Sequence, residues 1–322
     1  MAEEGFLNTQ TQRYAVVTGA NKGIGFEICR QLASKGIMVV LTARDEKRGT
    51  EAQEKLKGFG VSDNVVFHQL DVVDPASISS IVDFITTKYG RLDILKQFEY
   101  MQVNNAGISG IGLEGDSLIL QELIEESVAL LSDGGQPKPF HPKASGMVIE
   151  TFKGAEECVQ TNYYGAKRIT EALIPLLQLS DSPRIVNVSS LLGNLKLLSN
   201  EWAKEVLSKE ESLTEEKIDE VVQEFLKNFE KGSLEANHWP TRLSAYKVSK
   251  AALNAYTRYT AKKYPSFCIN CLCPGFARTD ITSNLGPLSA SEAAEGPVEL
   301  ALLPHGRRPS GLFFYRKEIS YF

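Results

Sequence analysis

Two side chains four residues apart, Tyr246 and Lys250, are the clearest candidates for acid–base chemistry in this 322-residue sequence. They lie in the segment SAYKVSKAALNAY, where i, i+4 spacing places both on one face of a helix. A free phenol has a pKa of about 10, which is too high for easy proton exchange at neutral pH. A nearby ammonium favours the phenolate and lowers that pKa, so Tyr246 is a candidate general acid. The Y-x-x-x-K spacing is common by chance, and its weight depends on the motifs around it.

A glycine-rich loop at residues 18–25 has the form of a phosphate-binding turn. It follows an apolar run at 14–18 and precedes a helical pattern. Glycines there would let the backbone approach a pyrophosphate, which the free N–H groups of the helix would face. Three glycines alone are a weak signal, but this strand-and-helix context favours a dinucleotide site. The predicted cofactor contacts in the loop are Gly19, Asn21, Lys22, Gly23, Ile24 and Gly25.

The end of the second predicted strand bears on the choice of cofactor. An acidic side chain at this point would bind a ribose 2′-hydroxyl and favour NAD, but the strand ends in Thr42-Ala-Arg44. Arg44 and Lys22 together suit a 2′-phosphate, because guanidinium and ammonium groups pair well with it. Asp45 follows directly and weighs against this interpretation. The pair of cations predicts NADP rather than NAD.

Strand and helix patterns alternate along most of the chain. Apolar runs at 37–44, 64–72, 184–190 and 268–275 read as strands that are apolar throughout, as expected for a sheet buried on both faces. Helical patterns separate them, including one long helix predicted over 156–178. This alternation predicts an α/β fold, a doubly wound parallel sheet (Rossmann fold) in a single domain over residues 1–322. Ligands in such folds bind at the carboxyl ends of the strands.

Two stretches interrupt the rhythm. Residues 111–150 are rich in Gly and Pro and are expected to be irregular. Residues 194–240 are expected to form an embedded helical insertion before the tyrosine, with Thr214 as an N-cap. The apolar side chains on one face of its helix predict packing against the main domain.

Composition limits the class of partner. The formal net charge is −5 with no basic block, which argues against nucleic acid or an anionic membrane. No apolar run approaches the ~20 residues that span a bilayer. The polar N-terminus lacks a secretory pattern, so a cytoplasmic location is expected. The cysteines at 268, 271 and 273 lack a fourth ligand nearby, and no metal site is predicted.

Six motifs in order resemble the short-chain dehydrogenase/reductase family. They are TGANKGIG, NNAG, NYYG, RIVNVSS, YKVSK and CPGFART. The long insertion between the serine and tyrosine motifs resembles the carbonyl reductase branch, and most closely the plant menthone, neomenthol and salutaridine reductases. The resemblance covers nearly the whole chain and implies a small-molecule carbonyl substrate.

The resemblance also implies roles for individual residues. Ser190 would bind the substrate carbonyl, Tyr246 would donate the proton, and Lys250 would bind the nicotinamide ribose and assist Tyr246. Asn162 would hold a water in the proton relay, although it can serve mainly to hold backbone together. Further cofactor contacts implied by the matching motifs are Asp71, Asn105, Ala106, Gly107, Pro274, Gly275 and Thr279.

The expected function is NADPH-dependent reduction of a ketone or aldehyde to an alcohol, with monoterpenoid ketones such as menthone as the best substrate guess. One alternative is an enone double-bond reductase, which in this plant group lacks the tyrosine that the chain keeps. The other alternative is a non-catalytic NADPH-binding protein, disabled by an atypical insert.

That insert is residues 96–102, KQFEYMQ, between a Leu-Asp-Ile-Leu stretch and Val103. The family usually joins these two stretches directly. A polar insert cannot enter a buried strand without leaving polar groups unpaired, so it must loop out or supply a replacement strand ending at Val103. A mis-joined gene model would produce the same insert. The 194–240 insertion resembles one thought to cover the helices through which relatives pair, so a monomer is expected.

Overall fold

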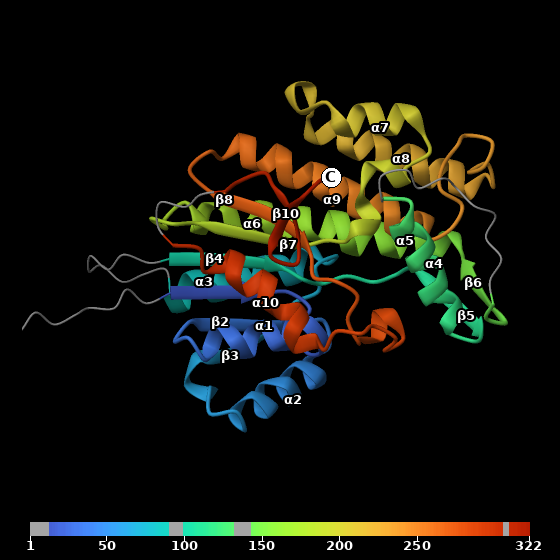
Figure 1. Ribbon diagram of the computed structural model, residues 1–322. Coiled ribbons are helices and arrows are strands. Elements are labelled where there is room, and N and C mark those ends of the chain that lie inside the picture. Colours follow the sequence, from blue (N-terminus) through green and yellow to red (C-terminus); the bar gives the residue numbers. More distant parts are fainter. Residues whose placement is uncertain (1–12, 90–98, 132–142, 305–308) are drawn as a thin grey trace, which may run out of the picture.

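The computed structural model describes residues 13–89, 99–131, 143–304 and 309–322 (Figure 1). The described residues form an eight-stranded sheet in the order β10-β9-β8-β7-β4-β1-β2-β3. Neighbouring strands pair in parallel except β9 and β10, which are antiparallel. The strands are β1 (Arg13–Val17), β2 (Met38–Ala43), β3 (Val65–Gln69), β4 (Glu99–Asn104), β7 (Arg184–Val188), β8 (Cys268–Cys273), β9 (Phe313–Tyr315) and β10 (Glu318–Ser320). The prediction of a doubly wound, mostly parallel sheet is confirmed.

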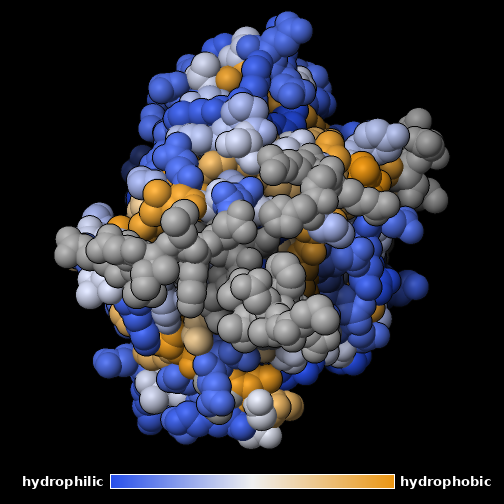
Figure 2. All heavy atoms as spheres, turned by 90° about the vertical axis from the view of Figure 1, so that its left-hand side faces the viewer, coloured by the Kyte–Doolittle hydropathy of each residue, from blue (hydrophilic) through white to orange (hydrophobic). Residues whose placement is uncertain are grey.

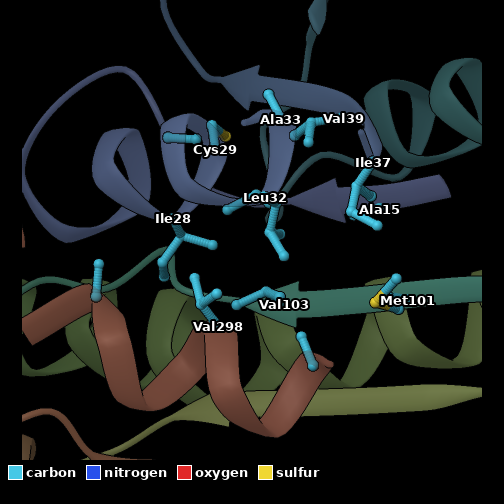
Figure 3. Packing of buried hydrophobic residues seen from close by; sticks show 14 of the residues in the cluster. Ala15, Ile28, Cys29, Leu32, Ala33, Ile37, Val39, Met101, Val103 and Val298 are labelled. Atoms are coloured by element: carbon cyan, nitrogen blue, oxygen red, sulfur yellow. The ribbon is translucent and has the colours of Figure 1, made fainter. Parts of the chain in front are cut away.

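Helices cover both faces of this sheet. One face carries α1 (Gly23–Ala33), α2 (Glu46–Lys57) and α10 (Ala290–Ala301). The other face carries α3 (Pro75–Tyr89), α6 (Ala166–Leu177) and α9 (Ser244–Lys263). On the first face Ile28 and Leu32 of α1 meet Val298 of α10 over Val103 of β4 (Figure 3). Figure 2 shows the side of the molecule on which β1 and β4 begin in Figure 1. On this side, small hydrophobic patches lie among hydrophilic residues.

The atypical insert supplies part of a central strand. Residues 96–98 lie outside the described residues, but β4 begins at Glu99 and pairs in register with β1. Met101 packs in the core, and Gln102 is fully buried. The Gln102 amide donates to Asn104 Oδ1 at 2.8 Å and to Thr170 Oγ1 at 3.0 Å, while its own Oε1 has no partner. The insert therefore supplies the replacement strand, at the cost of one buried, unpaired polar atom.

The described parts of the 111–150 segment, residues 111–131 and 143–150, form regular elements, so the expectation of irregular structure was wrong for them. They form the antiparallel pair β5 (Ile111–Gly115) and β6 (Gly146–Glu150), with α4 (Leu118–Ala129) between them in the chain. Ile119, Leu120 and Leu123 of α4 are buried in a small separate cluster. The Gly and Pro content was over-weighted as a sign of irregular structure, because packing against Leu192, Leu197 and Leu243 stabilises this short helix and strand pair and no local pattern records that packing.

Residues 194–240 contain two α-helices, α7 (Glu201–Ser208) and α8 (Glu215–Glu230). The Lys217 amide donates to the N-cap Thr214 as expected. Ile218, Val221 and Phe225 of α8 are fully buried against α9 and α5 (Phe152–Val159). Figure 1 shows both helices above α9, on the outside of the molecule.

The long helix predicted over 156–178 is interrupted. It consists of α5, a π-helical turn at Gln160–Gly165 and α6. The wider turn falls on the NYYG motif and places Asn162 in the interior, at 1% exposure. Wide turns inside α-helices occur often at functional sites. Across the described residues, no helix combines the length and apolarity that would let it span a membrane.

Candidate active site

Helix α9 carries the tyrosine–lysine pair into the interior of the molecule. Tyr246 and Lys250 lie one turn apart, with the Lys250 ammonium 5.6 Å from the centroid of the Tyr246 ring. Lys250 is buried, and its Nζ donates to the Val188 carbonyl oxygen at 2.9 Å. Val188 is the last residue of β7, so the pair lies at the carboxyl end of a central strand. This is the edge at which ligands bind in doubly wound folds.

The buried environment of Lys250 disfavours the charged form of its amine. Desolvation by burial lowers the pKa of Lys250 to about 8. An ammonium has three N–H donors, and within the described part of the chain Lys250 makes the single hydrogen bond to Val188. Two donors are therefore available for hydroxyl groups of a bound ligand. The donor set fits the ribose of a dinucleotide.

Ser190 follows β7 directly and faces the tyrosine. It has an extended backbone and begins a short 3-10 turn, where its Oγ accepts from the Leu192 amide at 3.1 Å. Burial raises the pKa of Tyr246, and a hydrogen bond with the Ser190 side chain opposes this shift. The sequence-based expectation of a lowered pKa is therefore wrong, because desolvation of the phenolate outweighs the hydrogen bond that favours it. The phenol stays protonated, which is the form that donates a proton.

Asn162 ties three parts of the site together. Its Nδ2 donates to the Ile108 carbonyl at 2.9 Å, and its Oδ1 accepts from the Ile108 amide at 2.8 Å. The same Nδ2 lies 3.1 Å from Ser249 Oγ, which in turn donates to the Tyr246 carbonyl at 2.9 Å. Asn162 thus joins the segment after β4 to the helix that carries Tyr246.

Gly107 leaves an open approach to the lysine. A Cβ on Gly107 would come within 3.3 Å of Asn162 Oδ1 and 3.6 Å of Lys250 Nζ. A side chain there would fill the space in front of both polar groups. The absence of one keeps a cradle that a ribose can enter.

The glycine loop packs closely on the NNAG segment. Gly19 has φ +61°, and a Cβ on it would lie 2.8 Å from Ala106 Cα. A Cβ on Gly25 would lie 2.4 Å from Asn105 Nδ2, which donates to the Thr18 and Gly19 carbonyls. Larger residues would force the loop away from the NNAG segment, so these glycines set how closely the two pack.

Another predicted cofactor contact, Thr279, lies close to the glycine loop. Gly23 begins α1, and a Cβ on it would lie 3.4 Å from Thr279 Cγ2. Thr279 follows β8 by way of Pro274 and Gly275, and Gly275 has φ +91°. The remaining predicted contacts are Asn21 and Ile24 of the loop and Asp71, which follows β3 and accepts from the Val73 amide.

The two predicted 2′-phosphate cations have different surroundings. Arg44 is exposed directly after β2. Asp45 next to it is the N-cap of α2, and it accepts from the Arg48 amide at 2.8 Å. Lys22 forms an exposed ion pair with Asp280. Such exposed pairs contribute little to stability, so Lys22 can exchange partners at low cost.

Sequence reasoning missed two residues of the site. Ser249 bonds to Asn162, and its place three residues after Tyr246 was the available signal. Glu150 caps the N-terminus of α9 from β6, and no local sequence signal marks a contact across 94 positions.

A family model for the short chain dehydrogenase matches residues 13–130. The (−)-isopiperitenone reductase of Mentha piperita is 60% identical over 95% of this chain and 97% of its own. The (+)-neomenthol dehydrogenase of Capsicum annuum is 56% identical over 98% of this chain and 99% of its own. The solved structure of a menthone neomenthol reductase from Mentha piperita is 57% identical, with a TM-score of 0.85 over 96% of this chain and 100% of that one.

The chain belongs to the short-chain dehydrogenase/reductase family. It falls in the branch of plant menthone and salutaridine reductases, because a salutaridine reductase of Papaver bracteatum is also 50% identical over 98% of both chains. It is therefore an oxidoreductase acting on carbonyl or alcohol groups. A carbonyl reductase [NADPH] 1 of Rattus norvegicus is 36% identical over 95% of this chain and 97% of its own. These relatives indicate a nicotinamide cofactor.

Proposed function

We propose that this chain is an NADPH-dependent reductase of ketones, with monocyclic monoterpenoid ketones such as menthone as its substrate class. The observation that carries the proposal is the meeting of Ser190, Tyr246 and Lys250 at the carboxyl end of β7. Relatives named for menthone, neomenthol and isopiperitenone support the substrate class.

The chain's own residues handle the carbonyl oxygen. Ser190 and Tyr246 are proposed to donate hydrogen bonds to this oxygen, which stabilise the negative charge that grows on it in the transition state. Bound NADPH would supply the hydride to the carbonyl carbon. Tyr246, held protonated by burial, then transfers its proton to the oxygen and completes the alcohol.

Lys250 and Asn162 support these steps. The free donors of Lys250 are proposed to bind the ribose hydroxyls in the cradle at Gly107. Proton transfer leaves a phenolate on Tyr246, and the nearby ammonium of Lys250 stabilises this negative charge. Asn162 holds the backbone at Ile108 and, as in the family it resembles, is proposed to hold a relay water.

NADPH rather than NADH is proposed from the end of β2. At the end of β2 the carboxylate of Asp45 caps α2, while the guanidinium of Arg44 is exposed. A guanidinium pairs with a 2′-phosphate through charge-assisted hydrogen bonds.

The test is NADPH oxidation by the purified protein over a panel of monoterpenoid and aromatic carbonyls, with product analysis. An alcohol product is expected, and Tyr246→Phe should lower kcat by about 100-fold or more while NADPH affinity stays within about twofold. A saturated ketone from an unsaturated cyclic ketone would instead identify a double-bond reductase. Tight NADPH binding without turnover of any carbonyl would favour the non-catalytic alternative.

The proposal extends to the state of the protein. The buried contacts of α8 with α5 and α9 cover helices that would otherwise be available for pairing, which supports a monomer. A single catalytic domain in the cytoplasm, with residues 194–240 as an embedded insertion, completes it. A stable tetramer in size-exclusion chromatography with light scattering would contradict the monomer.

A further inference from the structure

Glu150 makes a concentrated set of contacts at the start of the tyrosine helix. Its Oε2 accepts from the Ser244 amide at 2.8 Å and from the Ser244 hydroxyl at 2.6 Å. The Ala245 amide approaches the same oxygen at 3.5 Å. Ser244 is fully buried, and it is the first residue of α9, two positions before Tyr246.

Helix α9 has no cap of its own at this end. The N-cap position is Leu243, whose side chain offers no acceptor and whose backbone is left-handed, with φ +50°. The first amides of a helix lack partners within the helix and need an outside acceptor. A carboxylate also interacts favourably with the positive end of the helix dipole. Glu150 meets both needs from a distant strand.

The 111–150 segment presents this carboxylate. Glu150 is the last residue of β6 and pairs with Ile111 of β5. Glu126 of α4 forms an ion pair with Arg242 at 3.2 Å, just before α9. Leu243 and the Tyr246 ring pack with the apolar side chains of α4 in one cluster. The described elements β6 and α4 therefore pack together with the start of α9.

We propose that Glu150 is a positioning residue for the reaction, which sets the location of the Tyr246 phenol by capping α9 from the 111–150 segment. This inference rests on the proposed function, in which Tyr246 donates the proton. A displacement of a reacting group by about 1 Å costs on the order of 100-fold in rate. Glu150 itself does not touch the substrate; it acts through the first turn of α9.

The experiment compares Glu150→Ala with Glu150→Gln in the full chain, using NADPH and menthone. Glu150→Ala should lower kcat by roughly 10- to 100-fold, with the KM for NADPH within about twofold of wild type. Glu150→Gln retains a carbonyl oxygen of the same reach, so kcat should stay within about threefold of wild type. Hydrogen exchange at 243–247 should be faster in Glu150→Ala than in wild type and should recover in Glu150→Gln.

Asn200→Ala is the matched control. Asn200 caps α7 through the Ala203 amide at 2.8 Å, and α7 carries no proposed catalytic residue. This variant should speed exchange in α7 and leave kcat within about twofold of wild type. Wild-type kcat in Glu150→Ala, an equal loss in Asn200→Ala, or no recovery in Glu150→Gln would overturn the inference. If the wild type has no turnover, the proposed function fails by itself, and unchanged exchange at 243–247 in Glu150→Ala still refutes the cap.

Discussion

Gly193→Ala tests whether the serine loop and the tyrosine helix must touch. Gly193 ends the 3-10 turn that Ser190 begins, and its Cα faces the backbone of α9. A Cβ on Gly193 would lie 2.6 Å from the Lys250 carbonyl carbon and 2.8 Å from both Lys250 Cβ and its carbonyl oxygen. All three atoms belong to the backbone or to its first side-chain carbon, so no flexible group can move aside.

The expected effect follows from the missing space. Ordinary carbon contacts begin at 3.4 Å, so the loop and the helix must separate by about 1 Å. Such overpacking costs about 1–3 kcal/mol of stability. The same separation draws Ser190 away from Tyr246, and a misplacement of this size costs on the order of 100-fold in kcat.

The assay is steady-state turnover of NADPH with menthone, together with thermal unfolding. Gly112→Ala is the control, because a Cβ there would meet nothing closer than Ile149 Cβ at 3.8 Å and should leave kcat unchanged. A Gly193→Ala protein with kcat within about twofold of wild type and an unchanged melting temperature would refute the close contact.

Two further variants test the charges of the site. Lys250→Met should make the ligand-free protein more stable than wild type at pH 7, because it removes an ammonium whose pKa burial lowers from 10.5 to about 8. Between pH 8 and pH 10.5 the unfolded chain holds a proton that the folded chain lacks, so the stability of the wild type rises with pH. The stability advantage of Lys250→Met should therefore shrink over this range. Urea unfolding at pH 7, 9 and 10.5 measures it, and a difference in unfolding free energy that stayed constant across the three pH values would contradict the prediction. Arg44→Ala should raise the KM for NADPH by about 10-fold or more and leave that for NADH within about twofold. Steady-state kinetics with both cofactors measures this, with the exposed Lys47→Ala as control, and equal losses for both cofactors would oppose a 2′-phosphate contact at Arg44.

Local pattern carried much of the prediction. The alternation of apolar runs and helical periods indicated the parallel sheet. This was possible because the spacing of apolar residues within each strand or helix shows which of its faces are buried. The tyrosine and the lysine were placed together by helical spacing alone, and the structure has both on α9. The glycine loop was found in the same way, between β1 and α1.

The insert at 96–102 shows where pattern was insufficient. The sequence left two arrangements open, a loop before the strand or a replacement strand. Pairing of β4 with β1 in register, with Met101 in the core and Gln102 bonded to Asn104, decides for the strand. A central strand gains hydrogen bonds on both sides, which outweighs one unpaired amide oxygen.

By itself, then, the sequence determined the fold class, the phosphate-binding turn and the family, since these are expressed in residues close together along the chain. Only the tertiary structure decided that Glu150 caps α9, that β5 pairs with β6 across α4, and that burial raises the pKa of Tyr246. Each of these depends on contacts between distant segments, or on how much water packing excludes. No period or spacing in the sequence records either quantity.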